Sequence, residues 1–168
     1  IEHTICAHTF GMAWQQVFPE MMSADPLSIP HAKLLVIWGA NSTASNSHLP
    51  PLVNECKANG GTVVVIDPRR TGIADRADMH IPLLPGTDAV FAMAVTAELE
   101  RRGKLANSFI SEHVEGAEEF LAVCRNWNLD DAAEECGIDV ALLAQYVDLL
   151  VEQQSSTKVE LRDLLGER

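Results

Sequence analysis

Two short runs of almost uninterrupted apolar residues constrain the fold of this chain more than any other feature. Leu34–Trp38 reads Leu-Leu-Val-Ile-Trp, and Thr62–Ile66 reads Thr-Val-Val-Val-Ile. Strands of this composition are covered on both faces, as in parallel sheets between helices, whereas half-solvated antiparallel strands alternate apolar and polar residues. We therefore expect both runs to be central, parallel strands of one sheet.

The segment that connects the two runs has the pattern of a helix. Three apolar residues of the segment 47–59 fall on one helical face, Pro50 and Pro51 fit the first turn, and Gly60-Gly61 ends the pattern. A strand, a helix and a second parallel strand form a right-handed βαβ unit. The polar turns that follow the strands should then lie at one edge of the sheet, where open α/β sheets bind ligands.

The turn after the first run offers donors to an anionic ligand. Gly39 has no Cβ, so a phosphate or ribose could approach the backbone there, and Asn41 and Ser42 add donors beside it. The alternative is an ordinary strand-to-helix turn in which Asn41 and Ser42 cap the next helix. The turn lacks the pattern G-x-G-x-x-G, which disfavours NAD binding of the usual kind.

The turn after the second run carries a carboxylate and two arginines. Asp67 stands where an acidic residue reaches ribose hydroxyls in nucleotide-binding folds, and Pro68 fixes the turn. Arg69 and Arg70 could neutralise phosphate. The alternatives are a turn aspartate that precedes a proline, and arginines that are solvated or paired with nearby aspartates.

A third apolar run, MHIPLLPGTDAV, contains the turn Pro85-Gly86-Thr87-Asp88 and leads into a helix expected over residues 88–102. The Asp88 carboxylate could accept two hydrogen bonds from a planar N–H edge such as that of guanine, which would select guanine over adenine. The alternative needs no ligand, because Thr87 is a good N-cap and Asp88 in the first helical turn is favoured by the helix dipole.

A thiol and an imidazole stand close together near the N-terminus, at Cys6 and His8. A Cys6 thiolate could bind a metal, or could act as a nucleophile with His8 as its base. Nucleophilic catalysis is disfavoured because no oxyanion-type loop follows the cysteine. The alternative is an ordered turn or frayed terminus with a free cysteine. The four cysteines include no C-x-x-C pair, so we expect reduced thiols and neither a zinc site nor a disulfide framework.

The sequence therefore predicts an α/β, Rossmann-like parallel sheet flanked by helices, with a small C-terminal helical annex. Beyond residues 88–102, shorter helical patterns are expected at 106–114, 117–127, 129–136 and 139–152. The expected division is an N-terminal segment with the candidate metal-ligand loop (1–30), a nucleotide-binding core (31–105), the helical annex (106–153) and a tail (154–168).

Charge and hydropathy exclude several partners. The 168 residues carry 12 basic and 24 acidic side chains, for a net charge of −12, so a nucleic-acid backbone is not an expected partner. No apolar run is long enough to cross a bilayer. The chain begins at Ile1 without a signal-like segment, so we expect a piece of a longer protein. We expect a cytoplasmic location, or a periplasmic one if an upstream signal is missing.

Five motifs, taken in order and spacing, resemble the molybdopterin oxidoreductases of the dimethyl sulfoxide reductase family, which includes formate dehydrogenases and nitrate reductases. The motifs are C-A-H-T-F-G, L-L-V-I-W-G-A-N, V-V-V-I-D-P-R-R-T, A-D-M-H-I and L-P-G-T-D-A-V, and the resemblance covers residues 4–121. The ordered set is far more specific than any single motif.

The resemblance implies a segment that binds the guanosine part of a bis-molybdopterin guanine dinucleotide cofactor with molybdenum or tungsten. Cys6 aligns with the cysteine, selenocysteine or serine that ligates the metal, which implies a metal-binding and catalytic role. The remaining carry-over is by position: the turn with Gly39, Asn41 and Ser42 toward the phosphates, Asp67 toward the ribose, and Gly86, Thr87 and Asp88 toward the guanine. Pro68 and Arg69, beside Asp67, are also expected to be cofactor-binding residues.

Departures from the family limit what this piece can do by itself. Relatives show Asn-Pro where this chain has Asn41-Ser42, and His8 does not align with the histidine that follows the metal ligand in formate dehydrogenases. The cysteine cluster of an iron-sulfur centre would lie in a missing upstream region. We therefore expect an inactive fragment whose full-length form meets a small-molecule substrate and an electron-transfer partner. The alternative is a non-catalytic, Rossmann-like nucleotide-binding or interaction module.

Overall fold

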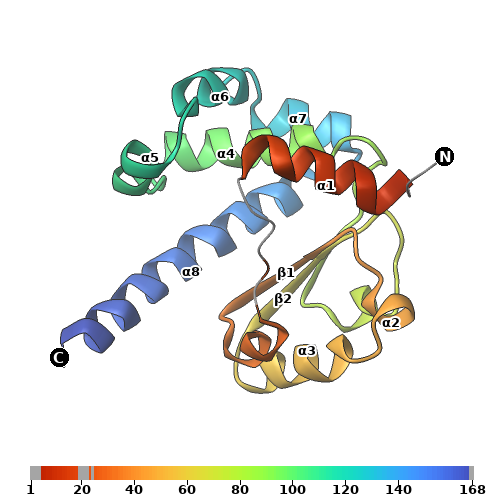
Figure 1. Ribbon diagram of the computed structural model, residues 1–168. Helices are drawn as coiled ribbons and strands as arrows, with labels where there is room; N and C mark the ends of the chain where they lie inside the picture. Colours follow the sequence, from red (N-terminus) through yellow and green to blue (C-terminus); the bar gives the residue numbers. More distant parts are fainter. Residues whose placement is uncertain (1–4, 19–22, 24, 167–168) are drawn as a thin grey trace.

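The computed structural model describes residues 5–18, 23 and 25–166, with side chains described for 8–18, 23 and 25–153. Helices surround a small sheet in this part of the chain (Figure 1). In chain order the elements are α1 (Ile5–Val17), η1 (Pro26–His31), β1 (Leu34–Trp38), α2 (Ser42–Ser45), α3 (Leu49–Ala58), β2 (Thr62–Ile66), η2 (Ala74–Arg76), β3 (Met79–Ile81), α4 (Asp88–Arg101), α5 (Asn107–His113), α6 (Ala117–Cys124), α7 (Leu129–Cys136) and α8 (Val140–Gly166).

The described strands form one parallel sheet in the order β1-β2-β3. Leu34 pairs with Thr62 and Trp38 with Ile66, and Ile66 pairs in turn with Ile81. The expected α/β class with a helix-flanked parallel sheet is confirmed. The expectation that both apolar runs are central is wrong for β1, because it is an edge strand of the described sheet and most of its residues are only half-buried.

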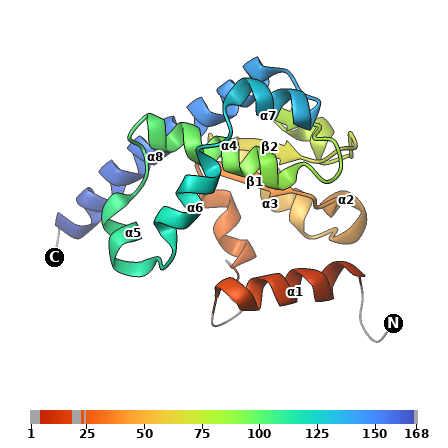
Figure 2. The same cartoon turned by 90° about the horizontal axis from the view of Figure 1, so that it is seen from above.

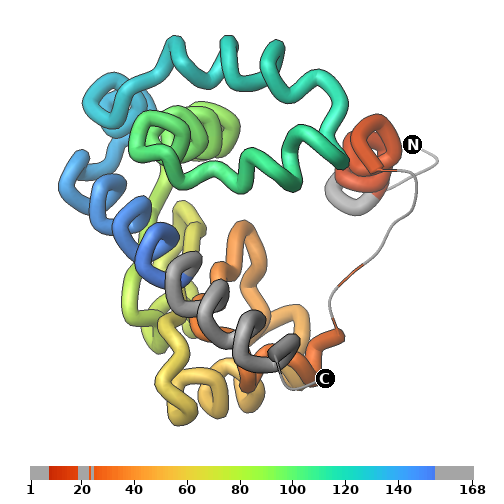
Figure 3. Tube along the Cα trace, turned by 90° about the vertical axis from the view of Figure 1, so that its left-hand side faces the viewer, coloured from red at the N-terminus to blue at the C-terminus, as the bar shows by residue number. Residues whose placement is uncertain are grey.

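Alternate side chains of β2 enter two separate cores. Val63 and Val65 pack toward α3, with Val53 and Cys56 of that helix. Val64 and Ile66 face the opposite layer, which contains α4, α7 and α8. These four side chains of β2 are almost completely buried, as the apolar run predicted. Figures 1 and 3 show α3 on one side of the sheet and the helices α4 to α7 gathered on the other.

The sequence predicted most of the described α-helices within a few residues, but it did not predict α1 or the short α2. The expected helix 47–59 is α3, which begins at Leu49, and the pattern 88–102 is α4. The turn or frayed end expected around Cys6 is instead part of α1, which the sequence analysis did not predict. Figure 2 shows the ribbon of α1 beside the other helices, and Val17 at its end lines a pocket with Thr96 of α4 and Ile110 of α5. The helix expected over 139–152 is α8, which continues to Gly166. None of the described helices is long and apolar enough to span a membrane.

Ion pairs join the annex helices to α4. Glu98, 8% exposed, accepts hydrogen bonds from Arg101 and from Arg102, and Arg102 also bonds to Asp148 of α8. These bonds, from Arg101 first and Arg102 second, lower the pKa of Glu98 from 4.5 to about 2 against the opposing effect of burial. A second group joins Glu100 of α4 and Glu118 of α6 through Arg125.

The annex also contacts the segment before α4. Leu84 N–H donates to the Cys136 carbonyl over 2.9 Å, at the turn from α7 to α8. Gly137 ends α7 with φ of +67°, and a Cβ at this position would lie 2.8 Å from the Leu84 side chain. This turn of the annex therefore packs directly on the chain that leads to Asp88.

Acid should weaken the fold through Glu98. The unfolded carboxyl titrates near 4.5 and the folded one near 2, so its contribution is complete above pH 5 and is lost as the pH falls through this interval. Allowing for solvent screening of the exposed Arg101, we expect a loss of about 2 kcal/mol in the free energy of unfolding between pH 5 and pH 2. Urea titrations at several pH values measure this loss.

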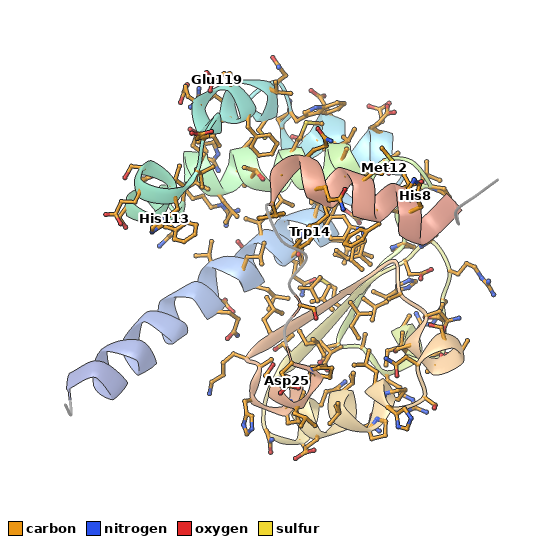
Figure 4. The ribbon with its side chains drawn as sticks, in the orientation of Figure 1. His8, Met12, Trp14, Asp25, His113 and Glu119 are labelled. Carbon is orange, nitrogen blue, oxygen red and sulfur yellow. The ribbon has the colours of Figure 1, made fainter. Side chains whose placement is uncertain are left out.

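Glu98→Gln should flatten this part of the pH profile. Glu119, exposed on α6 (Figure 4), provides the matched control, and Glu119→Gln should leave the profile almost unchanged. A Glu98→Gln profile as steep as that of the unaltered chain would contradict the assignment.

Gly137→Ala should destabilise the chain more than Gly103→Ala. Both glycines have a left-handed φ, of +67° and +65°, but a Cβ at Gly103 would have no neighbour within 4 Å. Gly103→Ala therefore measures only the backbone strain, about 1 kcal/mol, and Gly137→Ala adds the collision with Leu84. We expect at least about 1 kcal/mol of further loss in urea unfolding. Equal losses for the two variants would show that the Leu84 side chain moves aside without a cost in the free energy of unfolding.

Candidate functional site

The turns after β1 and β2 are joined to neighbouring strands by backbone hydrogen bonds. Gly39 N–H donates to the Ile66 carbonyl over 2.8 Å, and Asp67 N–H donates to the Ile81 carbonyl over 3.2 Å. Both bonds continue the parallel ladder by one residue beyond the strands. The first two candidate turns and the end of β3 therefore lie side by side at the carboxyl edge of the sheet.

A side-chain hydrogen bond brings the third turn to the same edge. The indole Nε1–H of Trp38 donates to Oδ1 of Asp88 over 2.6 Å. Trp38 is the last residue of β1 and pairs in register with Ile66, the neighbour of Asp67. Asp67 and Asp88, which lie 21 positions apart in the sequence, thus stand at one edge of the sheet rather than on opposite sides of the molecule.

In the first turn, neither candidate side chain caps the following helix. Asn41 Oδ1 accepts a hydrogen bond from Thr43 Oγ1 over 2.8 Å, and α2 has no side-chain cap. Ser42 is 2% exposed, and its hydroxyl has no hydrogen-bond partner within the described part of the chain. Gly39 adopts a φ of +62°, and no atom lies within 4 Å of the place of a Cβ. The turn therefore presents open backbone and one buried, unsatisfied hydroxyl.

In the second turn, Asp67 is 9% exposed and supports its own loop. Its Oδ1 accepts from the Arg69 N–H over 2.8 Å across Pro68, as the turn-aspartate alternative predicted. Its backbone carbonyl lies 2.8 Å from His80 Nε2, which must be the protonated ring nitrogen because a carbonyl can only accept. Oδ2 of Asp67 accepts no hydrogen bond from the described residues, so one carboxylate oxygen is available to a ligand.

The arginines of this loop differ in their partners. Arg70 Nε donates to Asp75 Oδ1 over 2.7 Å, so the ion-pair alternative applies to Arg70. Arg69 is exposed, and its backbone, rather than its guanidinium, makes the bond to Asp67. Asp78, another aspartate near this loop, pairs with Lys57 instead of with an arginine.

In the third turn, Thr87 occupies the expected N-cap position of α4, but its side chain does not cap the helix. Its hydroxyl donates to the Leu84 carbonyl over 2.8 Å, and no side chain caps α4. Gly86 has a φ of +94° with no atom within 4 Å of the place of a Cβ. Asp88 is exposed in the first turn of α4, and its Oδ2 accepts no hydrogen bond from the described residues. The expected positions of Thr87 at the N-cap and Asp88 in the first turn are confirmed, but the Thr87 side chain makes no capping bond, and Asp88 retains a free oxygen.

Two residues that the sequence analysis did not assign support this third turn. Cys136 Sγ donates a weak hydrogen bond to the Thr87 carbonyl over 3.7 Å, and Trp38 holds Asp88. Burial raises the pKa of the Cys136 thiol, which keeps the proton that this bond requires. From the sequence, Trp38 could be recognised only as a strand residue and Cys136 only as a helix residue.

The candidate metal ligand lies on another element. Cys6 belongs to α1, but its side chain lies outside the described residues, so its metal-binding and catalytic roles remain predictions. Figure 4 shows His8 on α1 and His113 on α5, far from each other. In the part of the chain whose side chains are described, no three His, Cys, Asp or Glu side chains form a group that could hold a metal ion.

No protein-family model matches the chain. The assimilatory nitrate reductase catalytic subunit of Bacillus subtilis is 28% identical over 138 residues, which is 81% of this chain and 19% of that protein. The F420-dependent formate dehydrogenase 2 subunit alpha of Methanococcus maripaludis is 30% identical over 70% of this chain and 17% of that protein. The solved structure of acetylene hydratase from Pelobacter acetylenicus superposes with a TM-score of 0.58 and 25% identity over 73% of this chain.

These matches agree with the five motifs in the sequence. The chain spans at most about a fifth of the length of these relatives, with 19% of the nitrate reductase and 18% of the acetylene hydratase chain covered. The chain is therefore a homologue of the molybdopterin oxidoreductases of the dimethyl sulfoxide reductase family, matched over one segment of their length.

Proposed function

We propose that this chain binds the guanosine part of a bis-molybdopterin guanine dinucleotide cofactor. The observation that carries the proposal is that the turns bearing the Asp67 and Asp88 carboxylates and the buried Ser42 hydroxyl all lie along one edge of a parallel sheet. Ligands of open α/β sheets bind at this edge. The relationship to molybdopterin oxidoreductases supports a molybdopterin cofactor as the ligand.

The first turn fits a phosphate. A buried hydroxyl without a partner is costly, and a phosphate oxygen would accept a hydrogen bond from it. Gly39 leaves the backbone accessible beside Ser42, and Asn41 lies between them. The loop after β2 is close by, because a Cβ on Gly72 would stand 3.1 Å from Thr43 Oγ1. We assign the phosphates of the cofactor to this turn, with Arg69 as the nearby exposed cation.

The two carboxylates fit the ribose and the base. Oδ2 of Asp67, on the turn set by Pro68, can accept from a ribose hydroxyl. Asp88, supported by the turn at Gly86 and Thr87, can accept from the N1–H and N2–H donors of guanine. Adenine has no such pair of donors on that edge, so Asp88 would favour guanine.

The metal chemistry belongs to the complete protein. The bound cofactor would supply two-electron redox chemistry at molybdenum or tungsten, and Cys6 is the proposed protein ligand of that metal. An iron-sulfur cluster, the small-molecule substrate and an electron-transfer partner are assigned to the remainder of a full-length oxidoreductase in the cytoplasm, or in the periplasm if a signal precedes it. We propose that the fragment alone has no activity.

A non-catalytic nucleotide-binding or interaction module is the second candidate. One observation favours it: Oδ1 of Asp67 and Oδ1 of Asp88 already accept hydrogen bonds from the chain itself. The edge is therefore partly satisfied without a ligand. A module of this kind has no reason to discriminate between purines, and this difference separates the two candidates.

Asp88→Asn should remove the preference for guanine. A hydrogen bond to a charged group contributes about 1.5 to 3 kcal/mol, so we expect the affinity for GDP to fall at least tenfold while the affinity for ADP changes little. Calorimetric titration of the chain with each nucleotide measures both. Equal binding of GDP and ADP by the unaltered chain would favour the non-catalytic module.

Ser42→Ala tests the phosphate subsite separately. It should weaken GDP and ADP equally, because both carry the same diphosphate. Ser45→Ala is the matched control, since that exposed hydroxyl on the same short helix donates to the Asn41 carbonyl and faces no unsatisfied group. Equal effects of the two variants would argue against a phosphate at Ser42.

A further inference from the structure

We propose that Trp38 is a positioning residue that sets the purine preference of this site by holding the Asp88 carboxylate through its indole N–H. The inference rests on the proposed function, because it concerns the same carboxylate. It adds a residue that recognises no ligand atom itself and acts only through Asp88.

The contact joins two parts of the chain that are remote in sequence. Nε1 of Trp38 lies 2.6 Å from Oδ1 of Asp88, across 50 positions. One residue ends β1 and the other begins α4. A short hydrogen bond from an N–H to a carboxylate is among the stronger side-chain bonds, so it fixes the orientation of an otherwise exposed carboxylate.

The buried core fixes the direction of the indole. The ring of Trp38 meets Phe91 edge-on, with centroids 5.5 Å apart and an interplanar angle of 89°. Phe91 is completely buried and packs in turn on Tyr146 at 5.4 Å. Trp38 itself is 39% exposed. One side of the indole is therefore anchored in the core of the α4 and α8 layer, while its donor reaches the sheet edge.

The geometry leaves the carboxylate able to bind a second pair of donors. Each carboxylate oxygen has two acceptor positions, so Asp88 keeps one on Oδ1 and both on Oδ2. A planar edge with two N–H groups needs both oxygens at once, in a fixed orientation. The indole is a neutral donor, so it orients the group without cancelling its charge. A guanidinium at this place would take both oxygens.

Trp38→Phe tests the inference, with Trp127→Phe as the matched control. Phenylalanine preserves an aromatic contact with Phe91 but has no N–H, and Trp127 lies between α6 and α7, away from the sheet edge. Calorimetric titrations use GDP, IDP and ADP. IDP lacks the 2-amino group of GDP, so the ratio of GDP to IDP affinity reports the two-donor contact.

We expect Trp38→Phe to reduce the preference for GDP over IDP and over ADP roughly tenfold, with ADP affinity unchanged. Trp127→Phe should keep all three affinities. A second variant replaces Trp38 by an isosteric analogue with sulfur in place of the indole N–H, which preserves the ring volume. It should lose the preference as Trp38→Phe does.

The outcomes separate this inference from the proposed function. If the unaltered chain binds no nucleotide, the proposed function fails and the inference fails with it. If the unaltered chain prefers GDP and both Trp38 variants retain that preference, only the inference is overturned. If both variants lose affinity for GDP and ADP equally, Trp38 has a purely structural role and the inference is likewise overturned.

Discussion

The alternating burial of β2 is the constraint on which the rest of the structure depends. Val63 and Val65 enter one core and Val64 and Ile66 enter the other, so the strand joins the α3 layer to the layer of α4, α7 and α8. Its backbone also fixes the register of β1 and β3. Because the strands are parallel, this register places their carboxyl ends, and the candidate site, along one edge.

Much of the fold could be predicted because burial leaves a strong compositional signal. Unbroken apolar runs rich in Val and Ile identified β1 and β2, and regular apolar spacing identified α4 and α7. The edge position of β1 could not be predicted, since composition shows that a strand is covered but not which strand lies beside it. The helix α1 was missed although Phe10, Trp14 and Phe18 recur every four residues, a spacing that can indicate a helix.

The location of the candidate site could be predicted from the sequence, but the hydrogen bonds that hold its turns could not. Strand ends and glycine turns are visible in a sequence, so the turns at Gly39, Asp67 and Asp88 were found. The bonds that hold them join residues about 50 positions apart, such as Trp38 with Asp88 and Cys136 with Thr87. Such pairs are created by the fold and leave no local pattern. Thr87 was correctly placed at the N-cap of α4, but its side-chain capping bond was wrongly expected, because the hydroxyl donates instead to the Leu84 carbonyl three residues earlier.

The buried Cys136 thiol lies beneath the third turn, so its reactivity reports how often that turn opens. Cys136 is fully enclosed and stays protonated, so a thiol reagent can reach it only when the packing between the α7 end and the Thr87 carbonyl comes apart. The rate at which the reagent labels Cys136 then measures how often this packing opens. A nucleotide bound on the opposite side of the turn would stabilise it and lower the labelling rate of Cys136. The labelling rate would then report nucleotide occupancy without an activity assay.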